Sequence, residues 1–160
     1  RQKGDVQVDT GSGDVRLEQV AAGKVDIDTG SGDIRLQDVA GTMSCDTGSG
    51  DIVGKALKLG SNLNADTGSG DVILSGDFSA VAQIAIDTGS GDVTLEASPA
   101  TAAPQVRMAV STGSGEISLD LPSSRVTHSG RGDLQADIGA ATGTAAISTG
   151  SGDVTLRTAQ

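Results

Sequence analysis

The sequence predicts an all-β protein, a single-domain parallel β-solenoid (β-helix) over residues 1–160. Three observations predict this fold class. A short motif returns about every 20 residues, apolar and polar residues alternate on both sides of it, and aromatic residues are almost absent. The chain has 24 glycines, one phenylalanine, and neither tryptophan nor tyrosine. A core built from Val, Ile, Leu and Ala has to be narrow, as the interior of a solenoid is.

The repeated motif is TGSG, usually followed by aspartate. Successive copies lie 17 to 24 residues apart and define about eight coils of roughly 20 residues. A period in this range indicates stacked units that each bury too little surface to fold alone. The coils are anchored at Thr10, Thr29, Thr47, Thr67, Thr88, Thr112, Ser129 and Thr149.

One unit, GKVDIDTGSGDIRLQDVA over residues 23–40, shows the pattern in full. Val25 and Ile27 alternate with aspartates before the motif, and Ile34 and Leu36 alternate with polar residues after it. Period-two alternation is typical of half-buried strands. Each unit therefore reads as strand, turn, strand, turn, and stacking places equivalent positions about 4.8 Å apart in two parallel sheets. A meander or sandwich is the rival, but it would favour hairpin turns of variable sequence.

The TGSG segment is the corner between the two strands. Ile27 and Ile34 both point inward although an odd number of steps separates them, so the alternation has to slip once between them. Gly30 and Gly32 permit the backbone angles of such a slip, and the hydroxyl of Thr29 can bond turn amides or a neighbouring coil. An ice-binding array of the Thr and Ser rows is the functional alternative. The DTGS signature of aspartic proteases is rejected, because that active site needs two lobes that meet at a cleft.

Carboxylates form two rows along the predicted stack. Like charges about 4.8 Å apart repel, so something has to compensate them. Hydrogen bonds from turn amides are one interpretation, and bound calcium is the other. The spacing is one residue shorter than in the nonapeptide calcium repeats. The calcium candidates are Asp28, Asp33, Asp46, Asp51, Asp66 and Asp71; one row comprises Asp9, Asp28, Asp46, Asp66 and Asp87, the other Asp14, Asp33, Asp51, Asp71, Asp92, Glu116, Asp133 and Asp153.

Four further features have structural interpretations. His128 stands in the first acid row as a surface-turn histidine, and Cys45 occupies an inward position as a small hydrophobe. The RGD tripeptide beginning at Arg131 follows from the repeat by one replacement and is expected within a tight ladder. Residues 96–105 hold two prolines, Pro99 and Pro104, which cannot donate to a ladder, so a loop is expected there.

The tandem TGSGDV and TGSGDI units, with DVRLEQVAG-like second halves, resemble a bacterial adhesin family of envelope-associated β-helix domains with tandem TGSGD repeats. The resemblance covers nearly the whole chain. It implies a right-handed β-helix, a non-enzymatic role without a cofactor, and a place in the cell envelope or outside the cell. The seventh unit, RVTHSGRGDL, and the lack of end caps depart from the family pattern.

The net charge of −10 argues against nucleic acid as a partner, and no apolar run is long enough for direct membrane insertion. The function expected is therefore a structural or binding module of the cell envelope, partnered by another envelope or surface component. Two alternatives remain: a rod whose last coil stacks on the first coil of the next copy, forming filaments, and an acidic calcium-binding rod. No set of residues typical of an enzyme stands out.

Overall fold

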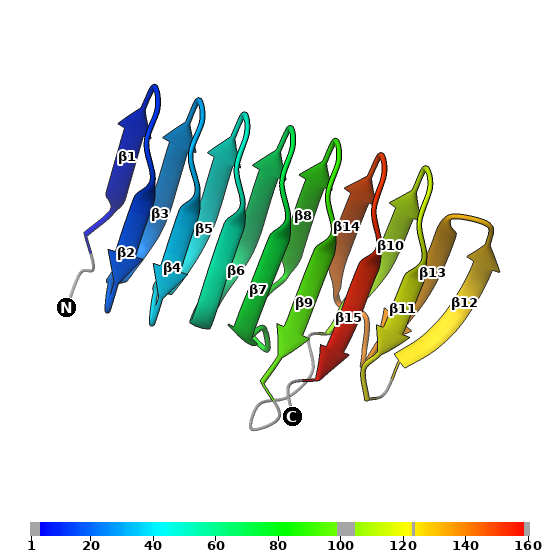
Figure 1. The fold of residues 1–160 in the computed structure, drawn as a ribbon. Coiled ribbons are helices and arrows are strands. Elements are labelled where there is room, and N and C mark those ends of the chain that lie inside the picture. Colours follow the sequence, from blue (N-terminus) through cyan, green and yellow to red (C-terminus); the bar gives the residue numbers. More distant parts are fainter. Residues whose placement is uncertain (1–3, 99–104, 123, 159–160) are drawn as a thin grey trace.

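The computed structural model describes residues 4–98, 105–122 and 124–158. All regular structure in these residues is β, which confirms the predicted class, and none of them forms a helix that could cross a bilayer. Figure 1 shows the strands side by side in an elongated stack. They are β1 (Val6–Thr10), β2 (Val15–Glu18), β3 (Ala21–Thr29), β4 (Ile34–Gln37), β5 (Ala40–Thr47), β6 (Ile52–Thr67), β7 (Val72–Asp77), β8 (Gln83–Thr88), β9 (Val93–Ala97), β10 (Val106–Thr112), β11 (Ile117–Asp120), β12 (Ser124–Gly130), β13 (Asp133–Ile138), β14 (Gly143–Thr149) and β15 (Val154–Thr158).

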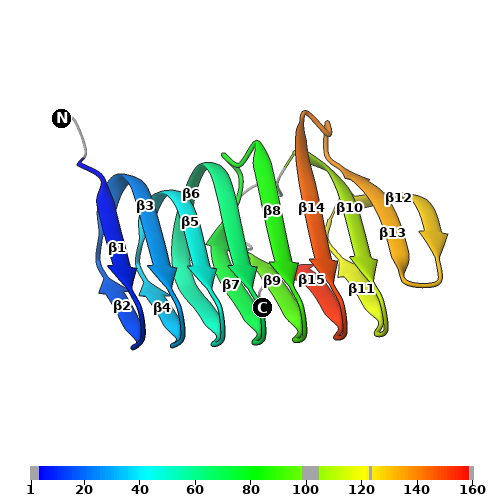
Figure 2. The same ribbon diagram turned by 90° about the horizontal axis from the view of Figure 1, so that it is seen from above.

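The strands form two layers that face each other across the core (Figure 2). The first layer contains β1, β3, β5, the second half of β6, β8, β14, β10, β13 and β12, in that order. The second layer contains β2, β4, the first half of β6, β7, β9, β15 and β11. The long strand β6 turns the corner from one layer to the other, so a single hydrogen-bonded sheet of fifteen strands links the described residues.

The core consists of the inward side chains that the alternation predicts. Val25 and Ile27 in β3, and Ile34 and Leu36 in β4, are buried, whereas the residues between them are half-buried or exposed. The same phase holds in every TGSG unit, and the parallel registers place equivalent residues opposite one another. At the ends of the stack the inward residues of β1 and β11 are only half-buried, because no further unit packs on them.

The TGSG corners follow the predicted geometry. Thr29 is buried with 1% of its surface exposed, and its hydroxyl donates to the carbonyl of Gly13 at 3.3 Å in the neighbouring unit. Gly32 has φ 135°, and a Cβ there would lie 2.4 Å from the carbonyl oxygen of Gly13. Buried threonines cannot present a hydroxyl array to ice. The equivalent bonds join Thr47, Thr67, Thr88, Thr149 and Thr112 to the carbonyls of Gly32, Gly50, Gly70, Gly91 and Gly152.

The units do not stack in chain order. The C-terminal unit, β14 and β15, lies between the β8–β9 unit and the β10–β11 unit. The chain leaves β9 at Ala97 and enters β10 at Val106. In the first layer β10 lies two positions beyond β8, and the last unit fills the position between them. Pro99 and Pro104 of the expected loop lie outside the described residues. The last coil is therefore internal, and end-to-end stacking, which stays a prediction, would have to use another surface.

The unit anchored at Ser129 was predicted to be a coil, and this was wrong. Strands β12 and β13 form an antiparallel hairpin, and β13 pairs antiparallel with β10. The segment lacks the TGSG corner, and a two-residue turn, Arg131-Gly132, with φ 80° at the glycine joins the two strands. The RGD tripeptide thus lies at a hairpin turn and not in a parallel ladder, and the Gly132 carbonyl accepts a bond from the Thr112 amide at 2.8 Å. The hairpin closes one end of the first layer, where no cap was expected.

Candidate functional site

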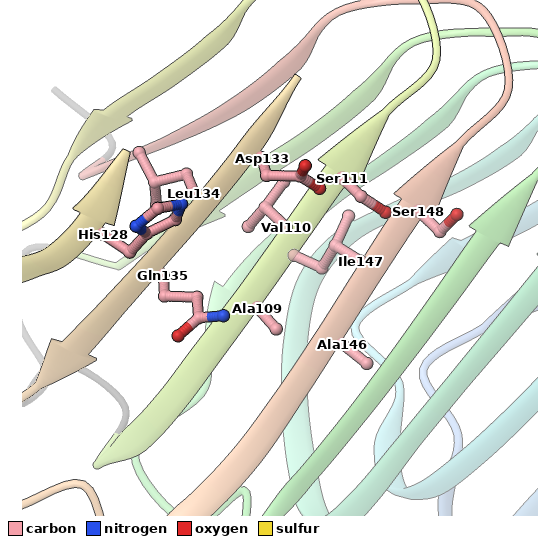
Figure 3. A pocket seen from close by; sticks show the side chains of 10 residues that line it. All are labelled: Ala109, Val110, Ser111, His128, Asp133, Leu134, Gln135, Ala146, Ile147 and Ser148. Carbon is pink, nitrogen blue, oxygen red and sulfur yellow. The ribbon is translucent and has the colours of Figure 1, made fainter. Parts of the chain in front are cut away.

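An open groove of about 490 Å³ lies on the outer face of the first layer, beside the hairpin. Figure 3 shows that its lining side chains come from β14, β10, β13 and β12. A regular solenoid has a flat outer face, whereas here the sheet turns away at the antiparallel hairpin. The groove is therefore a consequence of the departure of residues 124–138 from the repeat.

Two rows of outward residues cross the groove. In the first, Asp87 is followed by Ser148, Ser111 and Asp133 on successive strands. The second consists of Ala85, Ala146, Ala109, Gln135 and His128.

The floor of the groove is made of small residues. At the positions of Ser148 and Ser111 the other units carry aspartate, as at Asp66 and Asp87. Ala146 and Ala109 take the place of longer polar side chains such as Asn64. Each replacement removes side-chain volume from the outer face, so a ligand could approach the strands closely.

The wall of the groove belongs to the hairpin. His128 and Gln135 lie opposite each other on β12 and β13, and both are exposed. No hydrogen bond from another described residue reaches the side chains of His128, Gln135 or Asp133. The hairpin is held by other contacts, including the ion pair of Arg107 Nε with Asp137 Oδ1 at 3.0 Å. The groove therefore offers an amide, an imidazole and a carboxylate that are available to a ligand.

The structure corrects the predicted position of two of these residues. Asp133 was placed in the second acid row, but it lies opposite Ser111, in line with the first. His128 was placed in the first row, but it lies beside Gln135 in the neighbouring row. Both errors come from counting the hairpin as a parallel coil. The groove could not be found from the repeat alone, although the cluster of Ser and Ala at outward positions was a visible signal.

The first acid row approaches the groove along the same face. The carboxylates of Asp9, Asp28, Asp46, Asp66 and Asp87 occupy equivalent positions on adjacent strands. Within the described part of the chain, none of them receives a hydrogen bond or an ion pair. Loss of hydration raises the pKa of Asp66, and the carboxylates of Asp46 and Asp87 raise it further. Like charges on adjacent strands repel one another along this row, which we call the strained row.

The second acid row is compensated by the backbone. Asp33 Oδ1 accepts a hydrogen bond from the Asp51 amide at 3.0 Å, and Asp51 Oδ1 accepts one from the Asp71 amide at 2.9 Å. The interpretation that turn amides satisfy these acids is confirmed. The bonds run from unit to unit, so each carboxylate also helps to hold the stack together. The carboxylates that accept such a bond are, in spatial order, Asp14, Asp33, Asp51, Asp71, Asp92 and Asp153, and the amide of Glu116 is the last donor.

The calcium candidates divide between these two rows. Asp28, Asp46 and Asp66 lie in the strained row, and Asp33, Asp51 and Asp71 lie in the compensated row. Among residues 4–98, 105–122 and 124–158, no three acidic, histidine or cysteine side chains converge as a metal-binding group would. Calcium binding by the rod stays a prediction with no preformed site in the described structure.

Cys45 occupies the inward position that the repeat predicts. Burial raises the pKa of its thiol to about 12, and the carboxylate of Asp26 adds to the rise. The thiol is therefore neutral and behaves as a small hydrophobic side chain.

Comparison with known proteins identifies a family for the repeat. The family model described as Toastrack DUF4097 matches residues 2–103, which is more than half of the chain. The expected kinship with the envelope adhesin family was wrong, because the family that matches is a different domain of β-solenoid-like fold. No curated protein and no solved structure matches the chain. The groove residues all lie beyond residue 103, outside the matched segment.

Proposed function

The chain belongs to the Toastrack family, and from this premise we propose that it is a rigid, non-enzymatic binding module that holds a polar, positively charged segment of a partner in the groove. Within this proposal the seven TGSG units wind as right-handed turns, with the hairpin closing one end. The observation that carries the proposal is the groove itself, which lies where the repeat is broken.

The chemistry of the lining supports a polar ligand. Gln135 supplies donors and an acceptor, His128 a donor and an acceptor, and Ser111 and Ser148 hydroxyls. The only Phe, Tyr or Trp residue of the chain, Phe78, is buried in the core, so none of these rings is on the outer face to stack on a sugar or a base. An extended peptide segment fits these donors and acceptors best.

The charge of this face supports a cationic ligand. Asp87 and Asp133 lie at the two ends of the row that crosses the groove, and no Lys or Arg is among the lining residues. The strained acid row continues from Asp87 along the same layer. A lysine or arginine side chain at the groove would relieve part of this repulsion, and the field of the face would speed its approach.

The lining also supports a role without catalysis. His128 is exposed and receives no orienting hydrogen bond from another described residue, whereas a catalytic base is usually held by one. The groove is open to solvent along its length and does not exclude water. The expected place in the cell envelope rested on the overturned resemblance and stays untested.

Titration of the full-length, isotope-labelled chain with tetralysine tests this function by NMR. We expect the amide signals of β10, β13 and β14 to shift most, and the shifts to weaken as salt is added. Tetraglutamate should cause none of these shifts. Equal shifts along the whole acid row, or no shifts at all, would contradict the proposal.

A matched pair of substitutions distinguishes binding in the groove from general electrostatic attraction to the acidic face. Ala109→Leu places bulk on the floor of the groove and should abolish the selective shifts. Asn64→Leu is also an outward change on the first layer, three strands away from Ala109, and should leave them intact. If both substitutions weaken binding equally, the site is the acidic face and not the groove.

A further inference from the structure

The C-terminal unit occupies a position between two parts of the chain that precede it. Its amides and carbonyls bond β8 and β9 on one side and β10 and β11 on the other. The bonds include Gly150 N to Thr88 O at 3.0 Å and Val154 N to Glu116 O at 2.8 Å. Its inward residues Ala145, Ile147, Val154 and Leu156 are all buried. The rest of the chain thus forms a slot that a terminal segment has to fill.

This unit is a contiguous piece of the chain. It comprises residues 143–158 of the described structure, and nothing described follows it. Its strands pair with β8, β9, β10 and β11 in parallel ladders, as the strands of other TGSG units pair with one another. The octapeptide at Thr149–Leu156 has the same sequence as Thr88–Leu95 in the unit beside it. The slot therefore recognises a repeat unit and not a particular molecule.

The connection to this unit is short and strained. Residues 139–142 pass from the end of β13 across the start of β10 to β14, wrapped around Gln105, whose side chain accepts a bond from the Ala140 amide. Gly139 has φ 60°, and Ala141 has φ 50°, a left-handed angle that a residue with a Cβ adopts at a cost. Short hinges under strain favour exchange of the segment that follows them, because the hinge extends when two copies trade segments.

We propose that the slot takes the C-terminal unit of a second copy of this chain, so that two copies exchange β14 and β15. Every ladder bond and buried contact of the closed chain recurs in the exchanged pair, and the strained hinge straightens. Because β14 carries Ala146 and Ser148, each groove of the pair contains residues of both copies. The exchange does not depend on any ligand of the groove.

A disulfide reporter in the full-length chain tests the exchange. Thr94 and Thr155 are opposite each other on β9 and β15 and point outward, at the spacing of neighbouring strands, which a disulfide can bridge. In a Cys45→Ala background, Thr94→Cys with Thr155→Cys should form an intrachain disulfide in closed chains and an interchain one in exchanged pairs. We expect covalent dimers on non-reducing gels, in a share that rises with the protein concentration during refolding.

The matched control is Ile73→Cys with Thr94→Cys, in the same background. These positions are opposite each other on β7 and β9, which both belong to the part that does not exchange. Their disulfide should stay within one chain at every concentration. The proposal is overturned if the reporter pair also gives only intrachain disulfides, or if the control pair dimerises to the same extent.

A shortened hinge provides the second variant. Ile138 and Gly143 flank the start of β10, so they are two ladder spacings apart, roughly 9.6 Å. Deletion of residues 140–142 leaves two Cα steps, about 7.6 Å, which cannot span that distance. A folded dimer by light scattering supports the exchange. A folded monomer overturns it, and so does an unfolded chain, because the exchanged pair would have kept every contact of the stack.

Discussion

At the scale of single residues, position within the repeat decides the energetics of a carboxylate. Asp51 and Asp66 belong to adjacent corners of the same stack, yet Asp51 accepts an amide bond and Asp66 receives none from the residues that the structure describes. Hydrogen bonding to backbone amides stabilises the charged form of a carboxylate, whereas nearby like charges destabilise it. The two acid rows thus lie on either side of the TGSG turn. Backbone amides compensate the row after the turn, whereas the row before it is strained by repulsion between its carboxylates.

We expect Asp66→Asn to stabilise the protein at neutral pH. The folded-state pKa of Asp66 is raised, so the folded chain binds this proton at higher pH than the unfolded chain does, and stability falls as the pH rises through the raised pKa. At pH 7 the penalty is fully present, and removing the charge should add about 0.5 kcal/mol, the size of an exposed charge interaction. Urea unfolding of both proteins at pH 7 measures this difference.

The same comparison at about pH 3.5, below the ordinary pKa of aspartate, should show no benefit of the substitution. Asp9→Asn is the control, because Asp9 is at the end of the row and has a neighbour on one side only. It should stabilise less than Asp66→Asn. A loss of stability in Asp66→Asn at pH 7 would show that the row is compensated by something other than the described residues.

At the scale of the element, the TGSG corner works by close approach between units. Gly91 has φ 149°, and a Cβ there would lie 2.0 Å from the carbonyl oxygen of Gly70. The second corner is built differently: Gln19, Asp38 and Ala56 adopt φ of 54°, 53° and 53° without being glycine. The sequence indicated a break there but not its left-handed conformation, because only the corner after the first strand carries a recurrent glycine pattern.

Gly91→Ala should destabilise the protein by about 2 kcal/mol or more, since the new Cβ has to displace a backbone carbonyl as well as adopt an unfavourable φ. The matched control is Gly13→Ala, the equivalent glycine in the first unit of the stack, which also has a positive φ of 121° but where a Cβ would meet no atom within 4 Å. Thermal unfolding of the two variants should differ clearly. Equal losses would mean that contact between units is not what requires glycine in this corner.

At the scale of the whole molecule, the two ends of the chain have different environments. The first described unit, β1 and β2, is at one end of the stack, whereas the last, β14 and β15, is covered on both sides. The other end of the stack is closed by the hairpin, whose edge strand β12 is largely exposed, including Val126 at 50%. The last described unit in the chain is therefore not the last unit of the stack.

Hydrogen exchange of the native protein should reveal this disagreement. We expect the amides of β14 and β15 to be protected as strongly as those of β8 and β9, and more strongly than those of β1, because units at the end of a stack fray first. Mass spectrometry of exchanged fragments measures it. Faster exchange in β14 and β15 than in β1 would contradict the internal position of the last unit.

Most of the candidate site could not be predicted from the sequence. His128, Asp133 and the serines that replace aspartate were visible as departures from the repeat, but nothing local indicated that they share one groove. Their meeting requires the hairpin to fold back on β10 and the last unit to lie next to β10 on its other side. Both are contacts between segments distant in the chain, and period-two alternation is the same for parallel and antiparallel neighbours.

The sequence by itself determined the strands, their inward faces and the TGSG corner, because alternation and glycine spacing act on neighbouring residues, as at Val25, Ile27 and Gly32. Only the tertiary structure decided which unit lies beside which. The TGSG corner and the alternation recur from unit to unit, so this local pattern does not specify which unit pairs with which. The pairing of β13 with both β12 and β10 is one such long-range contact, which the repeat pattern does not indicate.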